Sequence, residues 1–94
     1  MKEEEGKSFH QLERIVRGFS NHRRIQILEL LKKSPELSVA EISGQLRINF
    51  KTAADHIRRL AIAGMVLKRN DGHSVRHKVS ERGEQVLKFL RILE

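Results

Sequence analysis

The sequence has no cysteine among its 94 residues. This absence excludes a disulfide framework, a thiolate nucleophile and a zinc site built on cysteine ligands. It also gives no reason to expect an oxidising compartment, so we expect a cytoplasmic location. A chain of this length closes one modest hydrophobic core, which excludes an enzyme with separate cofactor and substrate domains.

Long apolar runs are also absent. No run approaches the roughly 18 residues that a membrane span requires, and residues 1–5 lack the basic-then-apolar pattern of a signal peptide. Proline occurs once and glycine six times, and there is no internal repeat, low-complexity tract or linker. We therefore expect one soluble domain without a targeting segment.

Positive charge, in contrast, is abundant and concentrated. The chain has 19 Lys and Arg against 12 Asp and Glu, a net charge of +7. Residues 47–82 hold nine basic and three acidic side chains, so this window alone carries +6. A concentrated basic block indicates a face that meets an acidic partner.

Helical periodicity marks the first half of the chain. Residues 8–19 place apolar side chains at helical spacing before a break at 20–21. After Asn21 as an N-cap, the segment up to Ser34-Pro35 leaves little polar face, which is typical of a buried central helix. Ser38 and Glu41 form a capping box, which predicts a short third helix from Val39 to about Arg47.

A fourth helix follows after a short turn. Asn49 can cap it, and its apolar residues and small residues share one side, with Gly64 placed just past its end. The opposite side then presents Lys51, Asp55, Arg58 and Arg59.

The second half of the chain predicts a hairpin and a last helix. Residues 65–69 and 74–79 flank the turn signal Asn70-Asp71-Gly72. Ser80 can cap a final amphipathic helix. The expected fold is mainly α with a small β-hairpin, in the order α-α-α-α-β-β-α.

Two short helices joined by a tight turn, the second with an apolar inner and a basic outer face, are typical of a helix-turn-helix. A basic hairpin follows directly, so the pattern predicts a winged helix-turn-helix. Such a helix fits the major groove of DNA, and a cationic hairpin reaches neighbouring phosphates.

The stretch from Asn49-Phe50-Lys51-Thr52 to Ala63-Gly64-Met65-Val66 resembles the recognition helix of the ArsR-like winged helix-turn-helix family of prokaryotic transcription regulators. Residues 71–80 resemble its wing, and the likeness covers about residues 21–93. The Asn-Phe-Lys-Thr sequence is particularly similar to archaeal members. The resemblance implies a homodimer on double-stranded DNA, with the first and last helices at the dimer interface.

The resemblance has departures. Ser38 and Ala40 stand where the family's metal-binding cysteines would be, and the last helix has no His, so we expect no metal and no cofactor. Asp55 occupies a position where relatives place a base-contacting residue. Its carboxylate either accepts a hydrogen bond from cytosine or orients an arginine such as Arg59.

We expect one domain over residues 1–94 with four functional parts. Residues 1–20 and 81–93 supply dimerisation helices. Residues 38–64 form the helix-turn-helix, which includes the recognition helix 50–63, and residues 65–79 form the wing. The predicted DNA contacts are Phe50, Lys51, Thr52, Asp55, His56, Arg58, Arg59, Lys68, Arg69, His73, Arg76 and Lys78.

Several of these residues have an alternative role. The basic side chains of the fourth helix could form a solvated helix face, and those of the hairpin could protect an edge strand. Phe50 could touch a thymine methyl, but we favour packing back under the turn. For His56 and His77 we favour half-buried imidazoles over metal ligands.

The predicted dimer interface consists of apolar residues of the two terminal helices. These could instead be intrachain core, but two amphipathic helices exceed what one small core covers. The residues are Phe9, Leu12, Val16, Phe19, Val86, Phe89, Leu90 and Leu93.

The leading hypothesis is therefore a sequence-specific, double-stranded DNA-binding transcriptional regulator, a homodimeric repressor by default. The alternative is a winged-helix module that binds protein or RNA without sequence-specific duplex binding. We expect no enzyme, because the sequence shows no nucleophile-base pair, paired carboxylates or phosphate-cradling glycine loop.

Overall fold

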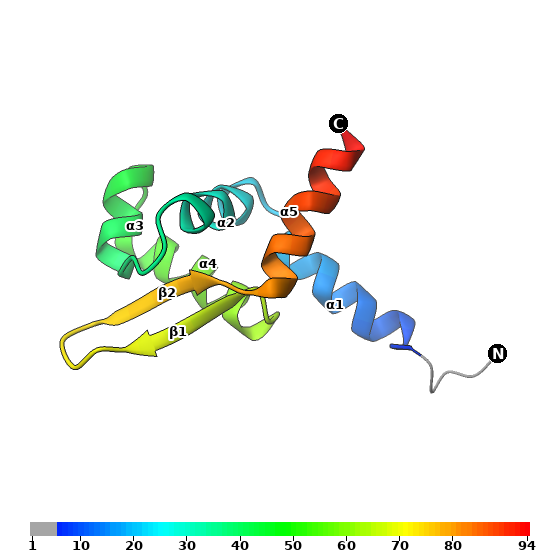
Figure 1. Cartoon of the computed structure of the whole chain (residues 1–94), viewed down its shortest axis with the longest axis horizontal. Helices are drawn as coiled ribbons and strands as arrows, with labels where there is room; N and C mark the ends of the chain where they lie inside the picture. Colours follow the sequence, from blue (N-terminus) through cyan, green and yellow to red (C-terminus); the bar gives the residue numbers. More distant parts are fainter. Residues whose placement is uncertain (1–5) are drawn as a thin grey trace.

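The computed structural model describes residues 6–94. These residues form five helices and a two-stranded antiparallel hairpin in the predicted order (Figure 1). The elements are α1 (Phe9–Phe19), α2 (His22–Lys33), α3 (Val39–Leu46), α4 (Phe50–Ile62), β1 (Val66–Asn70), β2 (Val75–Val79) and α5 (Glu81–Leu93). The expectations for residues 1–5 lie outside the described residues.

The helices begin at the predicted capping residues. Asn21, Ser38, Asn49 and Ser80 each accept backbone N–H groups of the helix that follows, and Glu41 completes the capping box of α3. Each such cap stabilises a helix by roughly 1 kcal/mol. Local side-chain chemistry therefore fixes where α2 to α5 start.

The core lies around α2. Ile27, Leu28 and Leu31 are fully buried and pack with Ile42 of α3 and Ile57 of α4. Burying each of these side chains contributes about 1.5–3 kcal/mol. The prediction of a buried central helix is confirmed, and α3 and α4 are held on it as a rigid pair.

The hairpin is shifted by one residue from the prediction. β1 starts at Val66, because the Met65 N–H donates to the carbonyl of Leu60 at 2.9 Å and so takes part in the turn that closes α4. Pairing runs from Val66 opposite Val79 to Asn70 opposite Val75, which places Asn70 in the strand.

A third segment pairs with the hairpin and was not predicted. The His77 N–H donates to the carbonyl of Leu37 at 3.0 Å, and the Glu36 N–H donates to the carbonyl of His77 at 2.8 Å. These bonds tie the α2–α3 loop to β2. The wing is therefore anchored to the helix-turn-helix by main-chain hydrogen bonds.

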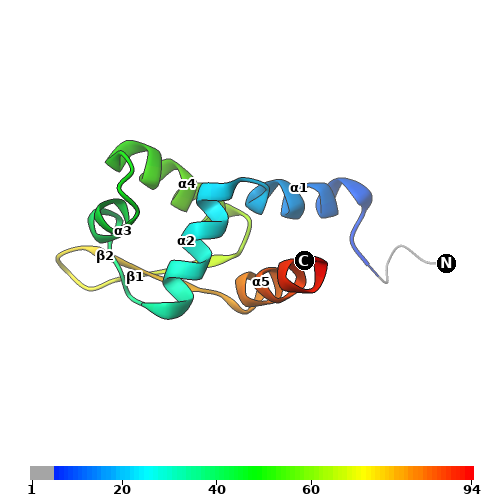
Figure 2. The ribbon, with the colours of Figure 1, turned by 90° about the horizontal axis from the view of Figure 1, so that it is seen from above.

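The elements are arranged with a clear polarity. The hairpin tip and α3 lie at one end of the molecule, and the free ends of α1 and α5 lie at the other (Figures 1 and 2). None of the helices within residues 6–94 combines the length and apolar character needed to cross a membrane.

Candidate nucleic-acid interface

The outer face of α4 is cationic, as predicted. Lys51, Arg58 and Arg59 are exposed, whereas Ala53 and Leu60 on the opposite side are buried. Thr52 is exposed on the same helix. The helix therefore presents basic and hydroxyl donors outward while its inner side packs on the core.

Asp55 holds the two arginines of this face. Its Oδ1 accepts from Arg58 Nη2 at 2.8 Å, and its Oδ2 accepts from Arg59 Nε at 3.1 Å. These hydrogen bonds hold the pKa of Asp55 below its usual value. Of the two predicted roles for Asp55, the structure has the one in which the carboxylate orients Arg59.

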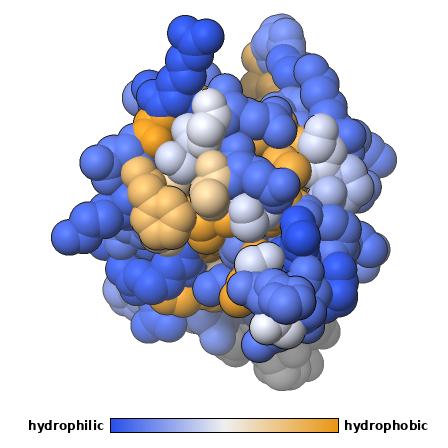
Figure 3. Space-filling model, turned by 90° about the vertical axis from the view of Figure 1, so that its left-hand side faces the viewer, coloured by the Kyte–Doolittle hydropathy of each residue, from blue (hydrophilic) through white to orange (hydrophobic). Residues whose placement is uncertain are grey.

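Phe50 begins α4 and does not pack under the turn. It exposes 54% of its surface, which contradicts our preferred interpretation. Figure 3 shows the end of the molecule with the hairpin tip and α3, where hydrophilic side chains dominate and small apolar areas interrupt them. An exposed phenyl ring at the start of α4 can contact an apolar group of a ligand, such as a thymine methyl.

His56 faces the interior side of α4. Its Nδ1 accepts from Arg24 Nε at 3.1 Å. Burial, together with the positive charge of Arg24, lowers the pKa of His56. The structure thus favours the half-buried imidazole over the DNA contact.

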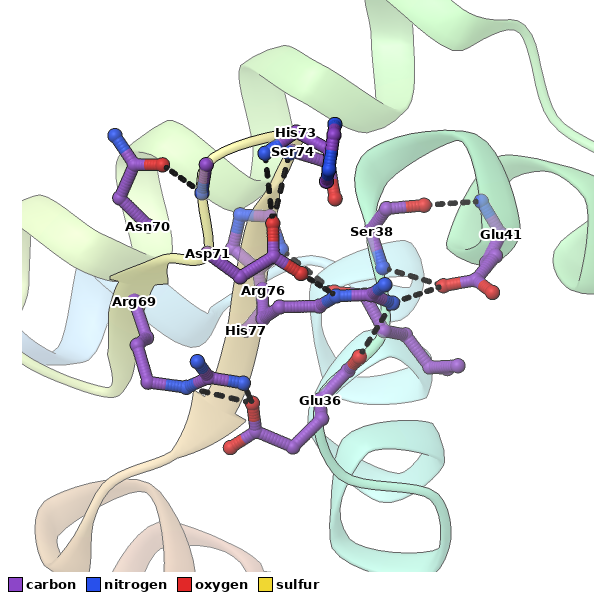
Figure 4. A network of polar contacts seen from close by, with 12 residues as sticks. Glu36, Ser38, Glu41, Arg69, Asn70, Asp71, His73, Ser74, Arg76 and His77 are labelled. Atoms are coloured by element: carbon purple, nitrogen blue, oxygen red, sulfur yellow. Dashed lines mark hydrogen bonds and ion pairs between the residues drawn. The ribbon is translucent and has the colours of Figure 1, made fainter.

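Arg76 joins the wing to the rest of the protein instead of projecting freely. Its Nε donates to Asp71 Oδ2 at 2.8 Å, and its Nη1 lies 3.3 Å from both Glu41 Oε1 and the carbonyl of Glu36 (Figure 4). Bonds from Arg76 and from the backbone of Ser74 hold the pKa of Asp71 well below its usual range. Arg76 is thus paired with acidic groups in the free protein, and its phosphate contact stays a prediction.

The other predicted wing residues fall into two groups. Arg69 donates to Glu36 Oε1 at 2.7 Å from Nη2, so its charge is paired. Lys68, His73 and Lys78 are exposed, and neither lysine forms an ion pair with another residue of the range 6–94. The lysines are therefore the free cations of the hairpin.

His77 is more buried than predicted. It exposes 2% of its surface, and its Nδ1 lies 2.8 Å from the carbonyl oxygen of Leu37. Burial lowers its pKa. Among the described residues, no group of three or more His, Cys, Asp or Glu side chains is placed to hold a metal ion.

The predicted dimer residues divide between surface and core. Phe9 exposes 89% of its surface. Phe19 and Val86 expose 9% and 8% and belong to the chain's own core, which leaves them little surface for the predicted interface. Leu90 is partly buried against that core. The prediction also missed Ile92, which is exposed. On α1 and α5, the large apolar residues that stay exposed are Phe9, Leu12, Val16, Phe89, Ile92 and Leu93.

The fold and the basic face of α4 define a winged helix-turn-helix protein. Residues 20–66, half of the chain, match the model of the winged helix-turn-helix DNA-binding family. The chain belongs to this family. No curated protein sequence matches it.

Solved structures extend the likeness to nearly the whole chain. One similar structure is Mb0332 of Mycobacterium bovis, a homodimeric winged helix-turn-helix DNA-binding domain (fragment 1–100) of a possible ArsR-family transcriptional regulator. It is 25% identical to this chain. Its TM-score is 0.80, with 94% of this chain and 87% of that chain covered. Reduced HlyU of Vibrio cholerae is 27% identical, with a TM-score of 0.77 over 98% and 97% of the two chains.

NolR of Sinorhizobium fredii is similar in fold alone. It is 18% identical, with a TM-score of 0.83 over 99% of this chain and 93% of that one. The family match and the Mycobacterium bovis domain confirm the predicted resemblance to ArsR-like proteins. The fold and its relatives are those of transcription regulators, not of enzymes.

Proposed function

We propose that this protein is a sequence-specific transcriptional regulator that binds double-stranded DNA as a homodimer and represses by obstructing polymerase. The observation that carries this proposal is the exposed cationic face of α4 within a winged helix-turn-helix, where Asp55 aligns Arg58 and Arg59. DNA as the partner also supports a cytoplasmic location.

In this proposal the helix-turn-helix of residues 38–64 places α4 in the major groove. Lys51 and Thr52 contact DNA from the first turn, with Phe50 beside them. Arg59 contacts base edges, because a guanidinium can donate two parallel hydrogen bonds to guanine. The wing of residues 65–79 adds phosphate contacts through Lys68 and Lys78.

The homodimer in this proposal forms through residues 1–20 and 81–93. Exposed apolar side chains on both α1 and α5 support it, since monomers rarely expose contiguous apolar patches. The homodimeric state of the Mycobacterium bovis domain supports it too. Two-fold symmetry would place two recognition helices about one helical turn of DNA apart.

Fluorescence anisotropy on a generic ~30 bp duplex at several salt concentrations tests the DNA surface, with single-stranded RNA as comparator. We expect micromolar duplex binding that weakens steeply with salt. Absence of duplex binding even at low salt would contradict the proposal and favour a module that binds RNA or protein.

Once an operator has been selected, Arg59→Ala and Lys78→Ala test the assigned roles. We expect Arg59→Ala to reduce the ratio of operator to random-duplex affinity by roughly tenfold, because base contacts discriminate by about 1–3 kcal/mol. Lys78→Ala should weaken both duplexes alike and reduce the salt slope by about one. Equal losses on both duplexes in both variants would refute this assignment.

A further inference from the structure

A pocket of about 350 Å³ lies where the end of α1, the start of α2, the end of α4 and the first turn of α5 meet. The volume falls within the range of small-molecule sites. Six of its lining residues are arginines: Arg14, Arg17, Arg24, Arg58, Arg59 and Arg82.

Few carboxylates offset these charges. Glu13 pairs with Arg17 at 3.3 Å, and Asp55 pairs with both Arg58 and Arg59. Six arginines and two carboxylates leave a formal +4. Arg14, Arg24 and Arg82 form no ion pair within residues 6–94. Cations gathered around a small pocket repel one another and therefore favour a bound anion.

Two of the unpaired arginines are nevertheless fixed in place. Arg24 Nη1 donates to the carbonyl of Arg17 at 3.1 Å, and Arg82 Nη1 donates to the carbonyl of Ala63 at 2.9 Å. Carbonyl acceptors orient a guanidinium without neutralising its charge. Burial and the nearby charge of Arg59 lower the pKa of Arg24, and the charge of Asp55 only partly opposes them.

The pocket also has an apolar part. Ile15, Ala63 and Ile62 line it, and Ile62 exposes 74% of its surface. Successive residues of a helix are about 100° apart around its axis, so Arg14 lies roughly 140° around α1 from the exposed Phe9. Arg14 therefore lies away from the apolar side of α1 and stays accessible in a dimer that forms through that side.

We propose that this pocket binds a small organic anion, in which an acidic group is bound by the arginines and an apolar body lies on Ile15 and Ile62. One consequence rests on the proposed function. Because Arg58 and Arg59 belong both to the pocket and to the DNA-binding face of α4, an occupied pocket competes with DNA for them. The ligand is then an effector that weakens operator binding.

Two fluorescent probes with the same ring system test the site. The anion 1-anilinonaphthalene-8-sulfonate should bind saturably, and Arg14→Ala should weaken its binding about tenfold, which corresponds to 1.4 kcal/mol. The uncharged N-phenyl-1-naphthylamine should change less than twofold. Lys33→Ala is the matched control, because it removes one exposed positive charge outside the pocket.

Equal sulfonate affinity in wild type, Arg14→Ala and Lys33→Ala would overturn the proposal, as would equal losses for both probes. Weaker duplex binding by Arg14→Ala with unchanged sulfonate binding would also overturn it and assign these arginines to DNA. The probe titrations contain no DNA. A failure of duplex binding would therefore refute the proposed function, whereas the probe titrations would still test the pocket independently.

Discussion

The imidazole of His77 lies inside the molecule between the wing and the α2–α3 loop. Its Nδ1 is 2.8 Å from the carbonyl oxygen of Leu37. Since a carbonyl oxygen can only accept, Nδ1 carries the proton in this contact. Burial disfavours the charged ring and lowers the pKa, so His77 is neutral in the folded protein at neutral pH.

This lowered pKa predicts a pH-dependent stability. Below an unfolded-state pKa of about 6.5, the unfolded chain binds the proton more readily than the folded chain. The stability that the neutral ring contributes is thus fully present above that pH and is lost as the pH falls through the lower pKa of the folded protein. His56 adds to the decrease, because its pKa is also lowered. Thermal unfolding followed by circular dichroism should give a lower Tm at pH 5.5 than at pH 7.5.

His77→Gln isolates the contribution of this residue. The Tm difference between the two pH values should shrink in this variant and stay at the wild-type value in His10→Gln, whose side chain is exposed. An undiminished difference in His77→Gln would assign the pH dependence to other groups.

At the residue scale, the sequence predicted what depends on neighbours along the chain. Alternation within β2 correctly placed His77 on the inner side and the charged Arg76 on the other. It could not show that Arg76 bonds to Glu36 and Glu41, because those residues lie 40 and 35 positions away. A basic side chain on a strand has the same pattern whether it faces solvent or a distant carboxylate.

At the element scale, helix starts were predictable because a cap is a local signal. As caps, Asn49 and Ser80 accept from N–H groups two or three residues ahead, so the sequence alone locates the starts of α4 and α5. The bridge between Leu37 and His77 had no such signal. A single pairing residue leaves no alternation to detect.

Packing between α5 and the hairpin leads to a second prediction. Gly83 is buried, and a Cβ there would lie 2.5 Å from the carbonyl oxygen of Met65 and 2.6 Å from Val79 Cγ2. Relief requires α5 to move away from the hairpin, since one of these atoms is backbone. Gly83→Ala should therefore reduce the free energy of unfolding by about 1–3 kcal/mol or more, measured by urea denaturation.

Gly44→Ala provides the matched control. Gly44 lies within α3, and a Cβ added there meets no heavy atom within 4 Å. Because alanine is the better helix former, this change should stabilise the protein by about 0.5–1 kcal/mol. Stability gains of similar size in both variants would show that α5 can leave the hairpin at no cost.

At the scale of the whole molecule, the basic window at residues 47–82 was predicted to form one face, and the structure divides it. Part of its charge lies on α4, and part on the lysines of the hairpin. Another part, at Arg69 and Arg76, is paired with acidic residues of the loop before α3, of α3 itself and of the hairpin turn. Net charge counts these groups equally, so composition alone could not separate free cations from paired ones.

The terminal helices were similarly divided, which leads to the last prediction. Phe19 and Val86 complete the core, whereas Leu12 keeps 46% of its surface exposed. If α1 forms the proposed dimer interface, Leu12→Glu buries two carboxylates per dimer at a cost of about 1–3 kcal/mol each. The dimer dissociation constant should rise by roughly one and a half to four orders of magnitude, as measured by analytical ultracentrifugation.

Leu67→Glu makes the same chemical change on β1, at a leucine with 54% of its surface exposed. Because this residue lies outside the proposed interface, the variant should dimerise like wild type, which separates a lost contact from a general effect of added charge. Leu12→Glu should also lose affinity for a two-half-site operator, since each recognition helix would then bind without its partner. A Leu12→Glu protein that dimerises as strongly as Leu67→Glu would remove α1 from the interface, and α5 would have to supply it alone.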